Sequence, residues 1–193
     1  MYKRQRKEHD LENDEYYYNK LAHASRYDTA DVIYIKRLLQ VELEEGLRSK
    51  IAGDLFEKVV GKSEDVFSRE LYMNADQMKC MLNNGMHIGN HGFDHNWLGS
   101  LSEEDQRNEI KQSLSFLEGI GCNLNQWTMC YPYGNYNAAT IQLLKDNNCS
   151  LGLTTKVNVA ALDEADRYEL PRLDTNDLPK DGAADKGDWF LKG

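Results

Sequence analysis

The chain has 193 residues, of which 40% are hydrophobic and 28% charged, a composition typical of a globular protein of about one domain. Lys and Arg number 23 against 32 Asp and Glu, and the net charge of −9 disfavours binding to nucleic acid or anionic membrane surfaces. No apolar run approaches the ~20 residues needed to cross a bilayer. The four cysteines include no Cys-x-x-Cys pair, which favours a reducing compartment, so we expect a cytoplasmic location.

The first third of the chain is predicted to be helical from about residue 29. Residues 8–27 are polar, rich in tyrosine and without a clear period, but over residues 29–61 Ile and Leu side chains recur at steps of three and four. Gly46 and Gly53 interrupt this stripe, which predicts two helices, or one broken helix, closed near Gly61. A short polar link follows.

The next helix is marked at both ends by capping residues. Asn74 is a good N-cap, and Gln77 three residues later completes the pattern of a capping box. The pair Asn84-Gly85 is expected to end this helix, because glycine adopts the left-handed position after a helix without strain.

Strands and helices alternate through the rest of the chain. Ser102 is expected to cap a helix that runs to about Glu118 and is ended by Gly119 and Gly121, and Asn137 caps the next helix. The expected strands are residues 86–91, 127–131, 151–155 and 169–173. This alternation predicts an α/β fold with a mainly parallel sheet.

Three of the five histidines are spaced by four residues, at positions 87, 91 and 95. Such spacing usually places side chains on one face of a helix, but Gly89 and Gly92 disfavour a helix here. A strand end that runs into a loop can instead bring His91 and His95 together, and neutral imidazoles are ligands of zinc and similar ions. Ordinary polar loop histidines are the alternative, and His87 is expected to be structural.

The second candidate segment is the run YPYGNYN at residues 131–137. Pro132 fixes the chain at the end of a strand, and Gly134 lets the following turn approach closely. The backbone N–H of Tyr133 is then free to point into a cleft beside aromatic rings, which suits a sugar ring and an oxyanion. A buried Tyr-Pro turn is the alternative interpretation.

Together, the two segments resemble the polysaccharide deacetylase family (NodB-homology domain, carbohydrate esterase family 4). The resemblance covers roughly residues 74–180 and rests on GMHIGNHGFDH, then a helix, then CYPYGNYN, in the family's order and spacing. The late run LPRLDTNDLP is similar to the later strands of bacterial members tied to surface polysaccharides. The resemblance implies a deformed (β/α) barrel, incomplete at the N-terminus, with a divalent metal at the carboxyl ends of its strands.

The family removes N-acetyl, and sometimes O-acetyl, groups, so the implied partner is a carbohydrate with N-acetylated sugars. By motif, His91 and His95 would be ligands of a divalent metal, with zinc expected, which polarises the acetyl carbonyl and activates water. Tyr133 would supply the backbone donor of the oxyanion hole, and Tyr131 and Pro132 would shape the substrate pocket.

The sequence also departs from the family pattern. No Asp-Asp pair occurs before His91, although the family's first motif uses such a pair as general base and third metal ligand. No His follows His95 to act as general acid. Arg172 and Asp174 are candidates for a pair that orients a catalytic group, with a surface role for Asp174 as the alternative.

These departures fit a chain shortened at its N-terminus. Residues 1–5 show no targeting pattern and resemble the translation of a transposon adapter used to prepare sequencing libraries. We expect them to be a non-native scar, with a natural basic N-terminus as the alternative. A partial deacetylase domain is then expected over residues 6–180, with a helical insertion at about 29–61 and a frayed tail over 181–193.

The function expected from these features is metal-dependent hydrolysis of N-acetyl groups on a carbohydrate, with the isolated chain inactive. One rival is a non-catalytic carbohydrate-binding relative that kept the fold and lost the acid and base. A structural zinc module of histidine and cysteine is the third possibility, which the absence of paired cysteines disfavours.

Overall fold

In the computed structural model, which describes residues 6–25, 27–161 and 166–183, the chain divides into two compact units, Met1–Tyr72 and Met73–Gly193. The expected scar at residues 1–5 and residues 184–193 of the expected tail lie outside the described residues. The predicted helical segment at 29–61 belongs to the first unit, and both candidate site segments belong to the second.

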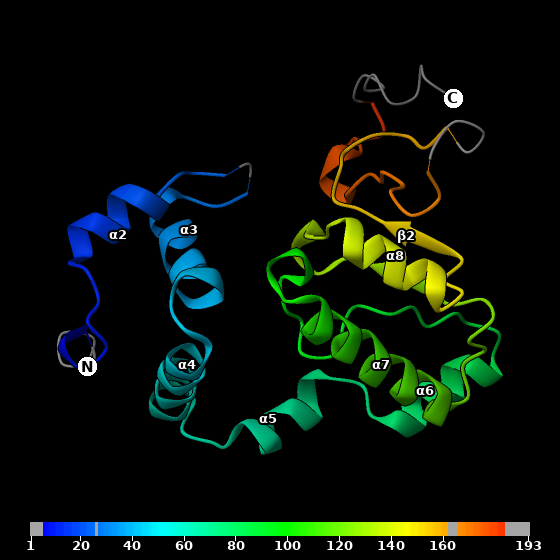
Figure 1. Ribbon diagram of the computed structural model, residues 1–193, viewed down its shortest axis with the longest axis horizontal. Helices are drawn as coiled ribbons and strands as arrows, with labels where there is room; N and C mark the ends of the chain where they lie inside the picture. Colours follow the sequence, from blue (N-terminus) through cyan, green and yellow to red (C-terminus); the bar gives the residue numbers. More distant parts are fainter. Residues whose placement is uncertain (1–5, 26, 162–165, 184–193) are drawn as a thin grey trace. The chain divides into compact units, whose positions relative to one another are not determined.

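The first unit is helical, and its elements follow one another along the chain (Figure 1). They are α2 (Asp14–Leu21), α3 (Ala30–Arg37), the π-helix η1 (Leu38–Glu42), α4 (Glu45–Val60) and α5 (Glu64–Leu71). The stripe is broken at the π-helix and the turn after it, and not at Gly46 and Gly53, which both lie inside α4. Helix α4 ends as expected at Gly61, whose φ is +68°. The sequence did not predict α2 and α5, because each is only eight residues long, shorter than the stretch over which a helical period can be recognised.

A small cluster of apolar side chains forms the core of the first unit. It contains Tyr17, Leu38, Leu43, Leu47 and Ile51. From Leu38 to Ile51 the members recur at steps of five and four residues, because η1 and the start of α4 turn the same stripe inward.

The helices of the second unit begin at the residues that the sequence predicted. They are α6 (Ala75–Asn83), α7 (Glu103–Ile120) and α8 (Ala138–Asp146), and their N-caps Asn74, Ser102 and Asn137 each accept a backbone N–H of the first turn. These bonds satisfy donors that a helix start leaves without an internal partner. One expectation was wrong, because Gly119 lies inside α7. The helix ends at Gly121, whose φ of +99° is the left-handed value.

The strands of the second unit are short and parallel. β1 (Thr128–Cys130) pairs with β2 (Leu151–Leu153), with Met129 opposite Gly152. The expected strands at 86–91 and 169–173 are reduced to single parallel bridges, from Asn90 to Met129 and from Leu170 to Leu153. Parallel pairing in an α/β unit is therefore confirmed, but the barrel expected from the family resemblance is not formed by the described residues, which give one two-stranded sheet.

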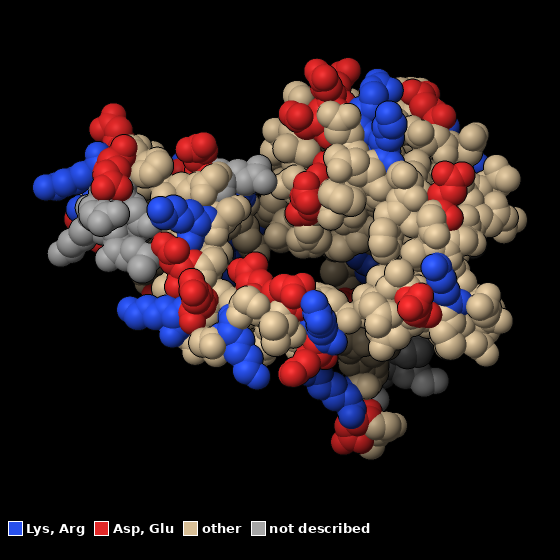
Figure 2. Space-filling model, turned by 90° about the horizontal axis from the view of Figure 1, so that it is seen from below, with Lys and Arg blue, Asp and Glu red and all other residues tan. Residues whose placement is uncertain are grey.

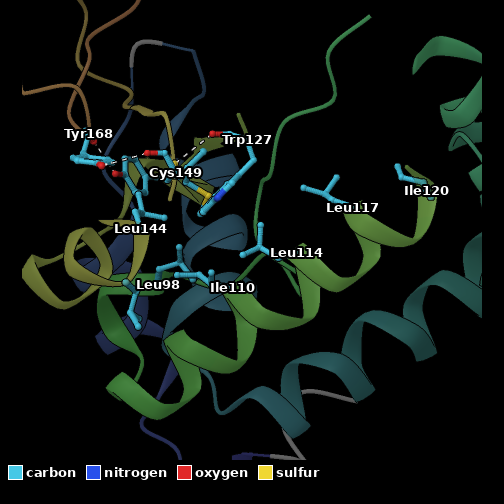
Figure 3. Close-up of a cluster of buried hydrophobic side chains, with 12 residues drawn as sticks. Leu98, Ile110, Leu114, Leu117, Ile120, Trp127, Leu144, Cys149 and Tyr168 are labelled. Atoms are coloured by element: carbon cyan, nitrogen blue, oxygen red, sulfur yellow. Dashed lines mark hydrogen bonds between the residues drawn. The ribbon is translucent and has the colours of Figure 1, made fainter. Parts of the chain in front are cut away.

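Helix α7 supplies one wall of the core of the second unit (Figure 3). Its residues Ile110, Leu114, Leu117 and Ile120 project from one side of the helix toward the sheet. The side chains that meet them include Leu98, Trp127, Met129, Tyr131, Leu144, Cys149 and Tyr168. This packing fixes the position of β1, whose carboxyl end leads into the candidate site.

The face of the molecule seen in Figure 2 has charges of both signs. On the face seen in Figure 2, Lys and Arg side chains are interspersed with Asp and Glu, and no large basic patch is visible. Among the described residues, none of the helices combines the length and the apolar character that spanning a membrane requires. The four cysteines are free thiols.

Candidate metal-binding site

His91 and His95 meet where the segment beside β1 ends. Their Nε2 atoms are 3.1 Å apart, and their ring centroids are separated by 4.8 Å. The residues between them form a loop, as the sequence predicted, because Gly92 at φ +81° and His95 at φ +58° reverse the chain. His87 lies outside this pair, with its Nε2 atom 3.0 Å from Oγ1 of Thr128.

The Nδ1 atoms of the two histidines also lie within hydrogen-bond distance of neighbouring oxygen atoms. Nδ1 of His91 lies 2.6 Å from the carbonyl oxygen of Cys130, which can only accept, so this nitrogen carries the proton and donates it. The lone pair of His91 Nε2 therefore faces His95. Nδ1 of His95 lies 3.1 Å from the hydroxyl of Tyr133, which can accept from it and leave Nε2 of His95 unprotonated as well.

This geometry fits two ligands of one ion. Two nitrogens at ~2.0–2.1 Å from a tetrahedral zinc lie about 3.3 Å apart, close to the 3.1 Å between the two Nε2 atoms. Burial, followed by the neighbouring His91, holds the pKa of His95 below its usual value, which favours the neutral form that binds metals. In the described part of the chain, no three His, Cys, Asp or Glu side chains gather as a metal site, so the pair is a two-ligand set.

Tyr133 lies beside the pair in the short 3-10 helix η3 (Pro132–Gly134). Its own φ is +57°, and the following Gly134, at φ +67°, packs so closely on Thr155 that a Cβ there would collide with it. The backbone N–H groups of Gly134 and Asn135 bond within the turn, whereas that of Tyr133 has no hydrogen-bond partner among the described residues.

Aromatic contacts place the ring of Tyr133 between Trp97 and the histidine pair. The ring stacks on Trp97, with centroids 4.7 Å apart and an interplanar angle of 16°, and its centroid is 4.6 Å from that of His95. The free N–H of Tyr133 is therefore carried by a residue that touches the histidine site directly, and aromatic surface of the kind that stacks on sugars is adjacent.

A largely apolar hollow of about 410 Å³ is lined in part by His91. Asn90, which pairs with Met129 of β1, also lines it. The large apolar side chains that line it are Met73, Met78, Ile88, Phe93, Phe116 and Leu117.

Tyr131 and Pro132, which the family motif assigns to the substrate pocket, have buried side chains in the structure. Tyr131 is 1% exposed, donates its hydroxyl hydrogen to the carbonyl oxygen of Tyr168 at 2.7 Å and stacks on Tyr136. Burial, as the largest cause, raises the pKa of its phenol well above the usual value. Pro132 is also fully buried. Both side chains belong to the core, which is the alternative of a buried Tyr-Pro turn.

The expected pair of Arg172 and Asp174 is not formed. Asp174 caps the 3-10 helix η4 (Thr175–Asp177), where its Oδ1 accepts the backbone N–H of Asn176 at 2.8 Å. Asp174 bonds to the nearby backbone and not to Arg172, because a short Asp side chain reaches neighbouring backbone N–H groups more readily than a distant guanidinium. Arg172 instead donates from Nε to the carbonyl oxygen of Thr154 at 2.9 Å.

Three buried polar residues around the histidine loop were missed by sequence reasoning. Glu109 on α7 accepts hydrogen bonds from the loop, and Asn90 joins the loop to Ser113 on the same helix. The signal for them was present, because Glu109 and Ser113 are polar residues four apart on the face of α7 that carries Ile110 and Leu114.

The second unit is thus an α/β unit with a candidate ion-binding histidine pair beside its parallel strands. A family model described as polysaccharide deacetylase matches residues 59–152, which contain both candidate segments. The family resemblance that the sequence motifs suggested is therefore confirmed.

Individual relatives match over part of their length. The chain is 28% identical over 117 residues, 60% of its length, to "Putative polysaccharide deacetylase YxkH" of Bacillus subtilis (strain 168), and spans 39% of that protein. Among solved structures, the deacetylase PplD of Streptococcus pyogenes, in complex with acetate, is 32% identical with a TM-score of 0.47. That match covers 52% of this chain and 44% of PplD. IcaB from Ammonifex degensii is 22% identical with a TM-score of 0.46, and the match covers 52% of this chain and 46% of IcaB.

Proposed function

We propose that the chain carries part of the active site of a metal-dependent deacetylase that removes N-acetyl groups from a polysaccharide, such as one of a bacterial surface. His91 and His95 would hold a divalent ion, and zinc suits two neutral imidazoles. The observation that carries this proposal is the 3.1 Å separation of the two Nε2 atoms, with Nδ1 of His91 fixed as a donor to the carbonyl of Cys130.

A divalent ion held there would polarise the acetyl carbonyl and ease deprotonation of the attacking water near neutral pH. The chain's own contribution is orientation. The N–H of Tyr133 would donate to the carbonyl oxygen as it gains negative charge, and removal of one such donor costs about 3 kcal/mol of barrier in other hydrolases. The stacked rings of Trp97 and Tyr133 would face the sugar.

The described residues leave two roles unfilled, a third ligand and a general base. We propose that carboxylates outside this chain fill both in the active protein, because the family's first motif is an Asp-Asp pair. A catalytic zinc usually has three protein ligands, and a general base contributes ~10²–10⁴-fold in rate. The chain by itself is then expected to bind zinc weakly and to release little acetate.

The experiment compares this chain with a form extended upstream through an Asp-Asp motif. Zinc content and acetate release from N-acetylated chito-oligosaccharides are measured for both forms. The extended form should show tight zinc binding and turnover, both lost on His95→Ala and kept on the control His87→Ala, since His87 lies outside the pair. Equal zinc occupancy and turnover in the two forms would refute the proposed division of the site.

A second candidate function is carbohydrate binding without catalysis. It is favoured by the two-ligand set in the described residues together with the Trp97–Tyr133 stack, which offers an aromatic face without needing a metal. This function predicts that the extended form binds chito-oligosaccharides with unchanged affinity after zinc removal and releases no acetate. Zinc-dependent acetate release would exclude it.

A further inference from the structure

A buried carboxylate on α7 contacts the loop that joins the two histidines. Glu109 is 5% exposed, and its Oε2 accepts hydrogen bonds from the backbone N–H groups of Phe93 at 2.9 Å and Asp94 at 3.1 Å. Its Oε1 accepts a third bond from Nδ2 of Asn96 at 3.1 Å. We infer that Glu109 is a positioning residue that fixes this loop, and with it the ring of His95, for the ion-binding role assigned under the proposed function.

The chemistry of the position requires a group that accepts several hydrogen bonds and donates none. A carboxylate has two acceptor oxygens and no hydrogen, so one side chain satisfies all three donors of the loop. Among the described residues, no basic side chain lies within ion-pair distance of Glu109, so these donors alone compensate its burial. Burying the carboxylate of Glu109 carries a desolvation cost that an apolar residue at this position would avoid. The hydrogen bonds to the loop explain why a carboxylate stands there.

The loop held by Glu109 has a backbone that needs support. His95 lies in the left-handed region at φ +58°, which a non-glycine residue adopts when its surroundings hold it there. At the other end, Gly92 lies so close to the carboxylate that a Cβ would be 3.3 Å from Oε2 of Glu109 and 3.3 Å from Cγ of Pro132. The loop therefore packs directly against the Glu109 side chain. The turn that the backbone makes there brings the ring of His95 next to that of His91.

A second anchor limits the effect of Glu109 to one histidine. One turn further along α7, Oγ of Ser113 accepts from Nδ2 of Asn90 at 2.8 Å, and Oδ1 of Asn90 accepts the N–H of Gly92 at 2.8 Å. This anchor fixes the start of the loop. Because His91 is also held through Cys130, loss of Glu109 should displace His95 and leave His91 in place.

The test uses the full chain with Glu109→Ala and Glu109→Gln, and Glu118→Gln as the control on an exposed position of the same helix. Amide hydrogen exchange at Phe93 and Asp94 reports the hold on the loop, and zinc titration followed by the ¹⁵N signals of the imidazoles reports the pair. We expect Glu109→Ala to speed exchange at both amides at least ~10-fold and to raise the zinc midpoint ~10–100-fold, the range for supporting residues of metal sites.

The conservative variant separates positioning from folding. Glu109→Gln keeps an acceptor oxygen of lower strength, so exchange and zinc midpoint should lie between those of the Ala variant and the wild type, while Glu118→Gln matches the wild type. A folded Glu109→Ala with wild-type exchange and zinc midpoint would overturn the inference. If Glu109→Ala does not fold, a Glu109→Gln variant identical to Glu118→Gln in both measurements overturns it.

Failure of the proposed function gives a different result. A wild-type chain whose histidine rings do not respond to zinc would refute the ion-binding role of the pair. The exchange rates at Phe93 and Asp94 need no metal, so unchanged rates in Glu109→Ala would refute the hold on the loop independently.

Discussion

The two units of the chain differ in how their helices begin and in what they bury. In the second unit, α6, α7 and α8 all start with a side-chain cap, and the core contains residues such as Leu144 and Met129 with no exposed surface. In the first unit, Asn13 caps α2, but α3, α4 and α5 start without a side-chain cap bond, and the core is a five-residue cluster. The difference indicates that the second unit has the local and tertiary constraints needed to hold a site to within a few tenths of an ångström.

Core truncation should give the largest contrast in stability. Leu144→Ala removes a fully buried side chain and should lower the free energy of unfolding of the second unit by about 2–5 kcal/mol. Ile51→Ala, at the margin of the smaller cluster with 8% exposure, should lie at the low end of that range, because a small core relaxes around a cavity more easily.

Urea denaturation measures both effects, with Leu71→Ala as the control, since Leu71 is 61% exposed and its loss should change stability by no more than about 0.5 kcal/mol. A larger loss from Ile51→Ala than from Leu144→Ala would reverse the comparison between the units.

Thiol reactivity distinguishes core from surface within the second unit. Cys149 is buried, and burial raises the pKa of its thiol to about 11, whereas Cys80 is exposed on α6. A rise of two units above the ordinary value lowers the thiolate fraction about 100-fold at neutral pH, and the thiolate is the reactive form. Iodoacetamide should therefore modify Cys80 in the native protein and Cys149 only after unfolding, as followed by mass spectrometry. Equal native labelling of both would contradict the core described for this unit.

Helix caps should give the smallest contrast. Asn137→Ala removes the side-chain acceptor that caps the start of α8, while the backbone N–H of residue 137 can still donate to Oγ1 of Thr140, and the loss should cost about 1 kcal/mol. Ser63→Ala, at the start of α5, should cost almost nothing, because Ser63 makes no side-chain cap bond. Thermal denaturation compares the two variants, and equal losses would show that the caps do not distinguish the units.

Local signals made much of this fold predictable. The caps Asn74, Ser102 and Asn137 act within one helical turn, so the sequence was sufficient to place them. The strands were harder to predict, because their length depends on which neighbours pair with them, and two of the four became single bridges. The helices α2 and α5 were missed because each has only eight residues, too few for a helical period to be recognised in the sequence.

In the candidate site, too, the features set by neighbouring residues were predictable and those set by distant residues were not. The meeting of His91 and His95 followed from the glycines that flank them, which is a local feature. The burial of Tyr131 depends on its hydrogen bond to Tyr168, 37 residues away, and could not be read from the motif. Glu109 was missed because its partners lie 13 to 16 residues earlier, on the far side of an intervening turn.

The most direct test of the account is whether the two histidines share one ion. In the ¹⁵N-histidine spectrum of the chain, zinc should shift the Nε2 signals of His91 and His95 together, while Nδ1 of His91 keeps its proton because it donates to Cys130. The Nε2 signal of His87, which lies outside the pair, should not change. A response at His87 in place of the pair, or no response at His91 and His95 at saturating zinc, would contradict the central claim.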